Sequence, residues 1–165
     1  MKSVTLALIA VLIALVAAPA AGGATKTRGK FQTIADGVTM GLDIEGIAQL
    51  TRTDDSTMAK AVVRGLEPGR TYAAHLHNAA CAAPLFGGGH YRNDPLGVAM
   101  PPNELWLSST DDPFAGITAD EEGVAVGFGS ADWEARPEAQ SIVVHYIPEG
   151  GTTAGGPKIA CADLA

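Results

Sequence analysis

Four histidines are the residues of this chain whose types and spacing could do chemistry. His75 and His77 end an extended, strand-like run, so their side chains point to the same face and both imidazoles can reach one ion. His145 ends another apolar run, and His90 follows three glycines that let the backbone bring a loop imidazole close to a metal. A lone strand histidine is more often a hydrogen-bonded structural residue, but a His-x-His pair with no histidine left over favours a mononuclear metal site.

The donor set favours copper over zinc. Four imidazoles in a tetragonal arrangement suit Cu(II), whereas structural zinc usually recruits thiolates or carboxylates. The only two cysteines are Cys81 and Cys161, and in an oxidising compartment we expect them to form a disulfide, with two independent buried thiols as the alternative. Closing this 80-residue loop would stabilise the fold by about 4.5 kcal/mol in the chain-entropy model.

The amino terminus has the composition of a secretory signal peptide. A short positive segment precedes the uncharged apolar residues 4–17, and Ala18, Pro19 and Ala20 supply the small residues that a signal peptidase reads. A helix over residues 4–17 would span only about 21 Å, short of a hydrocarbon core of about 30 Å. We therefore expect export rather than membrane anchoring.

Three segments are expected along the chain of 165 residues. Residues 1–20 are the signal peptide, with the cleavage bond between residues 20 and 24. The small and polar residues 21–30 are expected to be a loose leader, and residues 31–165 a single domain. The mature protein is expected to be secreted or extracytoplasmic, without stable membrane insertion.

Composition excludes several classes of protein. There is no collagen-like repeat and no sustained heptad pattern, and the chain is 47% apolar, which excludes a fully disordered protein. The formal net charge is −7, and a nucleic-acid binder would need a basic surface to displace counterions from phosphates. An anionic membrane surface is disfavoured for the same reason.

Short apolar runs bounded by Gly, Pro, Asp or Asn predict an all-β domain. Strands are expected at residues 56–66, 70–77, 105–107, 123–128 and 141–146. The turn Glu67-Pro68-Gly69 predicts that the first two strands form a hairpin. A brief helix is expected at residues 133–139, and the Pro-rich residues 84–102 form an irregular stretch of the kind that carries function. Without α/β alternation, an antiparallel sandwich or barrel is favoured.

Between about residues 65 and 161 the sequence resembles the copper/zinc superoxide dismutases. The segments that carry the resemblance, in the family's order, are GLEPG at 65–69, YAAHLH at 72–77, GHYRNDP at 89–95, ITAD at 117–120, GVA at 123–125, IVVH at 142–145 and AGGPKIAC at 154–161. They are similar to the strand with the His-x-His pair, the bridging-histidine loop, the following strand, the strand of the last copper ligand and the closing segment.

The resemblance implies an eight-stranded Greek-key β-sandwich or barrel and an oxidoreductase that converts superoxide to oxygen and hydrogen peroxide. It assigns one copper ion to His75, His77, His90 and His145, and it pairs Cys81 with Cys161. The family places an arginine beside the copper to attract superoxide, and here that position holds Lys158, which keeps the charge without the rigid fork of donors. The catalytic roles are expected at His90, as the ligand that takes up a proton, and at Lys158.

The sequence departs from the family at the zinc site. The family's zinc ligands include two histidines beyond the bridging one, but no histidine lies between His90 and Ile117, so zinc is not expected. His90 then needs another partner for its second nitrogen, and Glu104 and Glu149 are the candidates. Only twelve residues separate His145 from Lys158, fewer than in the family's electrostatic loop, and an open, shallow site is expected.

Two other functions remain open at this point. An exported copper-binding or copper-handling module would need the same four histidines without turnover, and a structural domain would need none of them, since a fold does not settle function. The short spacing between His77 and Cys81 trims a subloop that often builds the family's dimer, so a monomer is expected.

Overall fold

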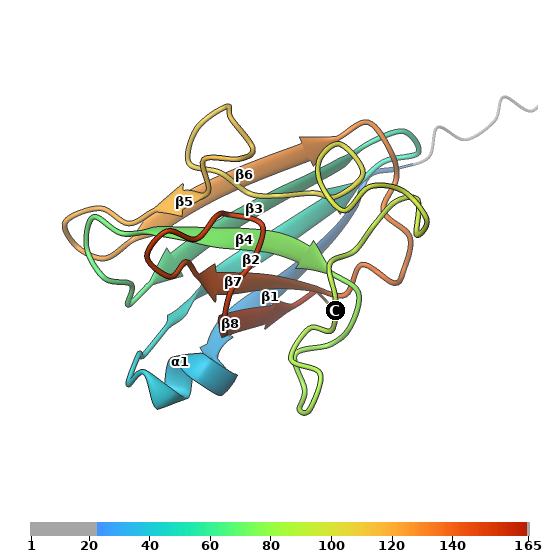
Figure 1. Cartoon of the computed structure of the whole chain (residues 1–165). Coiled ribbons are helices and arrows are strands. Elements are labelled where there is room, and N and C mark those ends of the chain that lie inside the picture. Colours follow the sequence, from blue (N-terminus) through green and yellow to red (C-terminus); the bar gives the residue numbers. More distant parts are fainter. Residues whose placement is uncertain (1–22, 165) are drawn as a thin grey trace, which may run out of the picture.

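The structure, a computed structural model, describes residues 23–164. The expected signal peptide at residues 1–20 lies outside the described residues. Within them the chain forms eight strands and one short helix (Figure 1). The elements are β1 (Thr25–Thr33), α1 (Ala35–Thr39), β2 (Glu45–Arg52), β3 (Thr57–Arg64), β4 (Thr71–His77), β5 (Ile117–Thr118), β6 (Ala125–Ala131), β7 (Ser141–Tyr146) and β8 (Lys158–Asp163). No helix in residues 23–164 is long and apolar enough to cross a bilayer.

The strands form one antiparallel sheet in the order β5-β4-β7-β8-β1-β2-β3-β6. Strand β3 lies beside β6 and β4 beside β7, so the connections cross between non-consecutive neighbours, as in a Greek key. Residues 104–108 bridge the two ends of the sheet, because Trp106 pairs with His75 on β4 and Ser108 with Phe128 on β6. The result is a nearly closed barrel, which confirms the predicted fold class.

The core fills the inside of this barrel. On β3, Thr57, Ala59, Ala61 and Val63 are buried and alternate with more exposed residues, as expected for a sheet with one face in solvent. Strand β4 is different, because it is buried on both faces. Its alternate residues Tyr72, Ala74 and Leu76 belong to the core, so the intervening histidines lie on the outer face, under covering loops.

Strand β1 corrects the expectation of a loose leader at residues 21–30. Residues 25–30 pair with β2 in an unbroken register from Thr25 opposite Arg52 to Lys30 opposite Ile47. The expectation rested on the polar composition of the segment. Backbone hydrogen bonds rather than buried side chains hold this end of β1, and most of its side chains are exposed or half-buried.

The expected hairpin between residues 56–66 and 70–77 is also wrong. Both segments are strands, but β3 pairs with β2 and β6, whereas β4 pairs with β5 and β7. The intervening turn is held elsewhere, since the Leu66 amide donates to the carbonyl of Gly123 and the Glu67 amide donates to the Tyr72 hydroxyl. These bonds direct the chain across the barrel instead of back along β3.

Two smaller expectations differ from the structure. Residues 105–107 are no regular strand, although the Leu107 amide donates to the carbonyl of Ala74 on β4. Residues 133–139 form turns and bends instead of a helix. Pro137 interrupts this segment, and the Arg52 guanidinium donates hydrogen bonds to the carbonyls of Ala135 and Ala139. The only helix in the described part of the chain is α1.

Candidate metal centre

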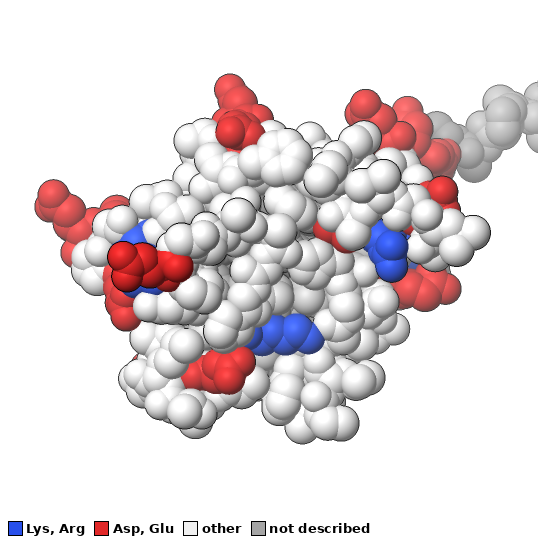
Figure 2. All heavy atoms as spheres, in the orientation of Figure 1, with Lys and Arg blue, Asp and Glu red and all other residues white. Residues whose placement is uncertain are grey.

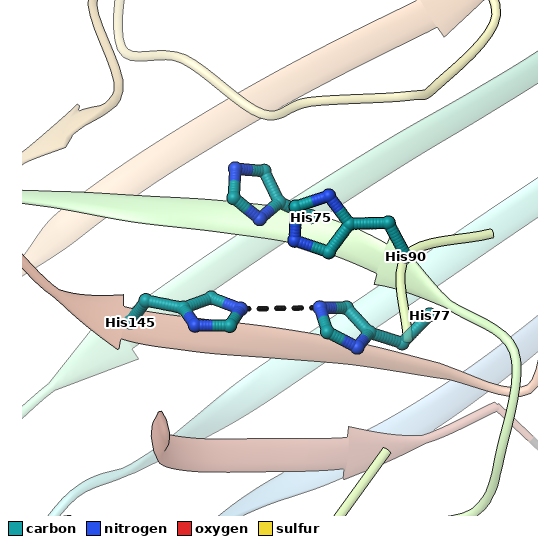
Figure 3. Close-up of side chains that lie close together, drawn as sticks. All are labelled: His75, His77, His90 and His145. Atoms are coloured by element: carbon teal, nitrogen blue, oxygen red, sulfur yellow. Dashed lines mark hydrogen bonds between the residues drawn. The ribbon is translucent and has the colours of Figure 1, made fainter. Parts of the chain in front are cut away.

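The four histidines converge on one point, on the outer face of β4 and β7 (Figure 3). His75 and His77 come from β4, as the His-x-His spacing predicts, and His145 comes from the adjacent β7, opposite Ala73. His90 lies on the loop after β4 and is brought alongside by an antiparallel bridge to His77. One nitrogen from each ring lies within 4.8 Å of the others.

The second nitrogen of three rings faces a backbone carbonyl. His75 Nε2 lies 2.7 Å from the oxygen of Thr153, and His145 Nδ1 lies 2.9 Å from the oxygen of Gly156. His77 Nδ1 lies 3.3 Å from the oxygen of Gly88. Because a carbonyl oxygen only accepts, each of these nitrogens carries the ring proton, and the opposite nitrogen presents a lone pair to the centre.

Burial keeps these rings neutral. Desolvation lowers the pKa of His75 and of His77 well below the usual value, and the neighbouring histidines lower both further. Desolvation also lowers the pKa of His145 to about 4, although its bond to Gly156 acts in the opposite direction. At neutral pH the three rings therefore offer unprotonated nitrogens, the form in which imidazole binds metals.

The ring nitrogens that face the centre have lone pairs without a hydrogen-bond donor to satisfy them. His75 Nδ1 is buried and has no hydrogen-bond partner. His77 Nε2 and His145 Nε2 lie 3.1 Å apart, at hydrogen-bond distance, yet each ring already uses its one proton on a carbonyl (dashed line in Figure 3). Two lone pairs facing each other at this distance are unfavourable, and a shared cation relieves the repulsion. The residues present thus fit a metal ion bound by four imidazoles.

Glu104 holds the fourth imidazole. This buried carboxylate accepts hydrogen bonds at Oε2 from His90 Nδ1 at 2.8 Å and from Trp106 Nε1 at 2.7 Å. Desolvation alone would raise the pKa of Glu104, but the bonds from His90 and Trp106 outweigh it, so the net pKa is lower than usual. Of the two candidates for this contact, Glu104 makes it, whereas Glu149 is exposed and makes no hydrogen bond to His90.

Lys158 and the disulfide fix the loop that follows β4. The Nζ of Lys158 donates to the carbonyls of Leu85 and Gly88, the latter being the oxygen that His77 Nδ1 faces. Burial lowers the pKa of Lys158. Cys81 and Cys161 form the expected disulfide and attach the same loop to β8. Lys158 therefore brings its charge close to the histidines and also supports the orientation of His77.

The centre is less open than expected. His75 and His77 are each 1% exposed and His145 is 3% exposed, whereas the side chain of His90 is 20% exposed. The short loop between β7 and β8 covers β4 and β7 instead of leaving them bare. It carries the Thr153 and Gly156 carbonyls to which His75 and His145 are bonded.

The sequence did not point to several contributors. Trp106 was expected only as part of a strand, and the carbonyl groups of Gly88, Thr153 and Gly156 give no signal because every residue carries one. The clearest sequence signal for this part of the site is the run of three glycines before His90, which lets that loop come close to the other histidines. All four histidines of the chain lie in this one cluster.

Comparison with known proteins identifies the fold. No model of a known protein family matches the chain, and no curated protein matches it in sequence. The Cu/Zn superoxide dismutase from Brucella abortus superimposes with a TM-score of 0.53 at 18% identity, covering 86% of this chain and 100% of that one. A double mutant of a SOD-like protein from Bacillus subtilis matches with a TM-score of 0.50 at 16% identity, over 83% of this chain and 95% of that one.

A single mutant of a SOD-like protein from Bacillus subtilis gives the same TM-score of 0.50 and 16% identity, over 83% of this chain and 96% of that one. At these identities the likeness shows the fold alone. The chain has the superoxide dismutase fold and carries on it a four-histidine cluster that could bind a metal.

Proposed function

We propose that this chain is an exported superoxide dismutase that uses one copper ion, without zinc, to convert superoxide to oxygen and hydrogen peroxide. The observation that carries the proposal is the convergence of one ring nitrogen from each of four histidines, each opposite a ring nitrogen that is already hydrogen-bonded. Such partners fix the tautomer and the orientation of metal-binding histidines. Copper, when bound, supplies the one-electron redox couple that dismutation requires.

Glu104 supports the absence of zinc in this proposal. A zinc ion shared through His90 would need His90 Nδ1, and that nitrogen donates to the carboxylate of Glu104 instead. The chain offers no further histidine for a second metal. In this reading Glu104 orients His90 from the side where the family has its zinc.

In this proposal, the charge of Lys158 and the exposure of His90 define where superoxide approaches the site. Superoxide is an anion, and Lys158 provides a positive charge beside the loop that orients His77. His90 has the one ring of the four with substantial exposed surface, so this proposal puts proton exchange with solvent at its Nε2. We expect His90 and Lys158 to be the residues that the substrate meets.

Export and a monomeric state are part of the same proposal. The disulfide between Cys81 and Cys161 supports an oxidising, extracytoplasmic compartment. Sequencing the amino terminus of the secreted protein tests cleavage between residues 20 and 24, and light scattering of the mature protein tests the monomer.

The first experiment is superoxide consumption by the mature protein loaded with one equivalent of copper. The metal-free protein and His75→Ala are measured alongside, with the copper content of each sample. Rapid consumption by the loaded protein that both controls lack supports the dismutase. Stoichiometric copper binding without consumption would overturn the enzyme and leave a copper-handling module. Failure to bind copper would overturn both.

A further inference from the structure

Trp106 is a buried tryptophan that packs against His75 and is linked to His90 through Glu104. It lies on the segment that closes the barrel, and it is 5% exposed. Its backbone pairs with His75, and the flanking residues are bonded to β4, because the Leu76 amide donates to Leu105 and the Leu107 amide to Ala74. The position of the indole is therefore set by the same strand that carries His75 and His77.

The indole N–H holds the carboxylate that holds His90. Trp106 Nε1 donates to Glu104 Oε2 at 2.7 Å, and this is the oxygen that accepts from His90 Nδ1. Glu104 is only 3% exposed, so loss of the indole N–H removes one of its two side-chain hydrogen bonds in a largely desolvated place. Both bonds end on the same oxygen. Removal of the indole N–H therefore leaves His90 as the single side-chain donor to the Glu104 carboxylate, and the carboxylate becomes freer to rotate.

The indole ring also packs against His75. The two ring centroids are 4.8 Å apart with an interplanar angle of 47°, and the Phe114 ring packs against the indole in a T-shaped arrangement with a centroid distance of 5.4 Å. His75 is in turn bonded through Nε2 to the carbonyl of Thr153. The His75 ring is thus confined by the indole on one side and by a hydrogen bond at its edge.

We propose that Trp106 is a positioning residue for the metal centre, acting on His90 through Glu104 and on His75 by direct packing. The inference rests on the proposed copper site and adds to it a single side chain that couples two ligands from different segments. The other tryptophan, Trp133, is half-buried and donates its indole N–H to the carbonyl of Pro102, so it has no hydrogen bond to Glu104 or to the histidines.

Trp106→Phe tests the proposal, because phenylalanine keeps an aromatic ring but removes the N–H donor to Glu104 and part of the ring that packs against His75. Trp133→Phe is the matched control. In metal-free protein labelled with ¹⁵N-histidine, we expect wild-type His90 to be protonated at Nδ1, and Trp106→Phe to give a mixture of tautomers. We also expect Trp106→Phe to weaken Cu(II) binding about tenfold and to change its electron paramagnetic resonance spectrum. The control changes neither. A wild-type tautomer pattern with copper affinity within twofold in Trp106→Phe overturns the inference.

A measurement on the unmodified protein covers the case in which Trp106→Phe does not fold. One equivalent of Cu(I), which is diamagnetic, is added while the histidine ring and indole N–H resonances are followed. We expect the histidine resonances and the Trp106 indole N–H to move, and that of Trp133 to stay. If the histidine resonances move and Trp106 does not, the inference is wrong. If the histidine resonances themselves do not move, the proposed copper site is wrong.

Discussion

At the scale of single residues, the second nitrogen of each imidazole decides what the first can do. Three rings face carbonyl groups of the backbone, but His90 faces a carboxylate, Glu104, which is ionised and buried. An anion bonded to an imidazole N–H raises the basicity of the opposite nitrogen more than a neutral carbonyl does. Glu104 is therefore the partner whose chemistry a substitution can change most directly.

We expect Glu104→Gln to lower the affinity for Cu(II) by about tenfold, because the amide is uncharged and brings an N–H₂ group into a place with two donors. Isothermal titration of copper into the metal-free protein measures the change. Glu149→Gln is the control, since Glu149 is exposed and lies outside these contacts, and its affinity should equal that of the wild type. Equal affinities in the two variants would remove Glu104 from the site.

At the scale of elements, the loop after β4 supplies both His90 and the Gly88 carbonyl to the candidate metal centre. Gly87 has a φ of +87°, where glycine is favoured, and it is buried. A Cβ added there would overlap Val143 Cγ2 and lie 3.5 Å from His77 Nδ1. The loop approaches β7 so closely because this residue has no side chain.

Gly87→Ala should therefore displace the Gly88 carbonyl from His77 and weaken copper binding by at least tenfold. Gly150→Ala separates the steric overlap of the added Cβ from the backbone strain of a positive φ. Gly150 also has a positive φ, +73°, but has no atom within 4 Å of an added Cβ. That control carries the backbone strain alone and should bind copper as the wild type does. The idea fails if both variants lose affinity equally, as titration would reveal.

The elements also show how far the sequence could predict this protein. The His-x-His spacing on an extended run sufficed to place His75 and His77 on one face, because side chains alternate along any strand. The sequence reduced the partner of His90 to two glutamates but could not choose between them, since the choice depends on how residues 92–104 fold back. The hairpin expectation failed because a good turn sequence fixes local direction and says nothing of which strand becomes the neighbour.

At the scale of the whole molecule, the disulfide between Cys81 and Cys161 links the loop after β4 to strand β8. Cys81→Ser with Cys161→Ser should lower the free energy of unfolding by about 4.5 kcal/mol in the chain-entropy model. Denaturant unfolding of the metal-free proteins measures this without a contribution from bound copper. We also expect weaker copper binding, because the bridge and Lys158 hold the same loop. An unchanged unfolding midpoint would show that the bridge adds nothing to the fold.

Net charge decides the last prediction. The chain carries −7 overall, and Figure 2 shows acidic side chains spread over the visible face, most of them toward its edges, with a basic side chain near the centre. A superoxide anion is therefore repelled at long range and attracted only by charge close to the site, such as Lys158. Salt screens both effects, with a screening length of about 10 Å at 0.1 M.

The salt dependence of the rate separates the long-range repulsion by the net charge from the local attraction by Lys158. In the wild type we expect the rate of superoxide consumption to fall as salt is added, because screening removes the attraction of Lys158. In Lys158→Gln we expect a several-fold lower rate and a clearly weaker fall with salt, because the repulsion by the net charge is then opposed by fewer nearby cations, of which Arg92 beside Glu104 is one. Lys158→Arg keeps the charge and should keep the steepness of the wild-type dependence. All three proteins are compared at equal copper content, so that a loss of metal is not mistaken for a loss of attraction. A Lys158→Gln rate that falls with salt as steeply as the wild type would place the attracting charge elsewhere and leave Lys158 with only its bonds to Leu85 and Gly88.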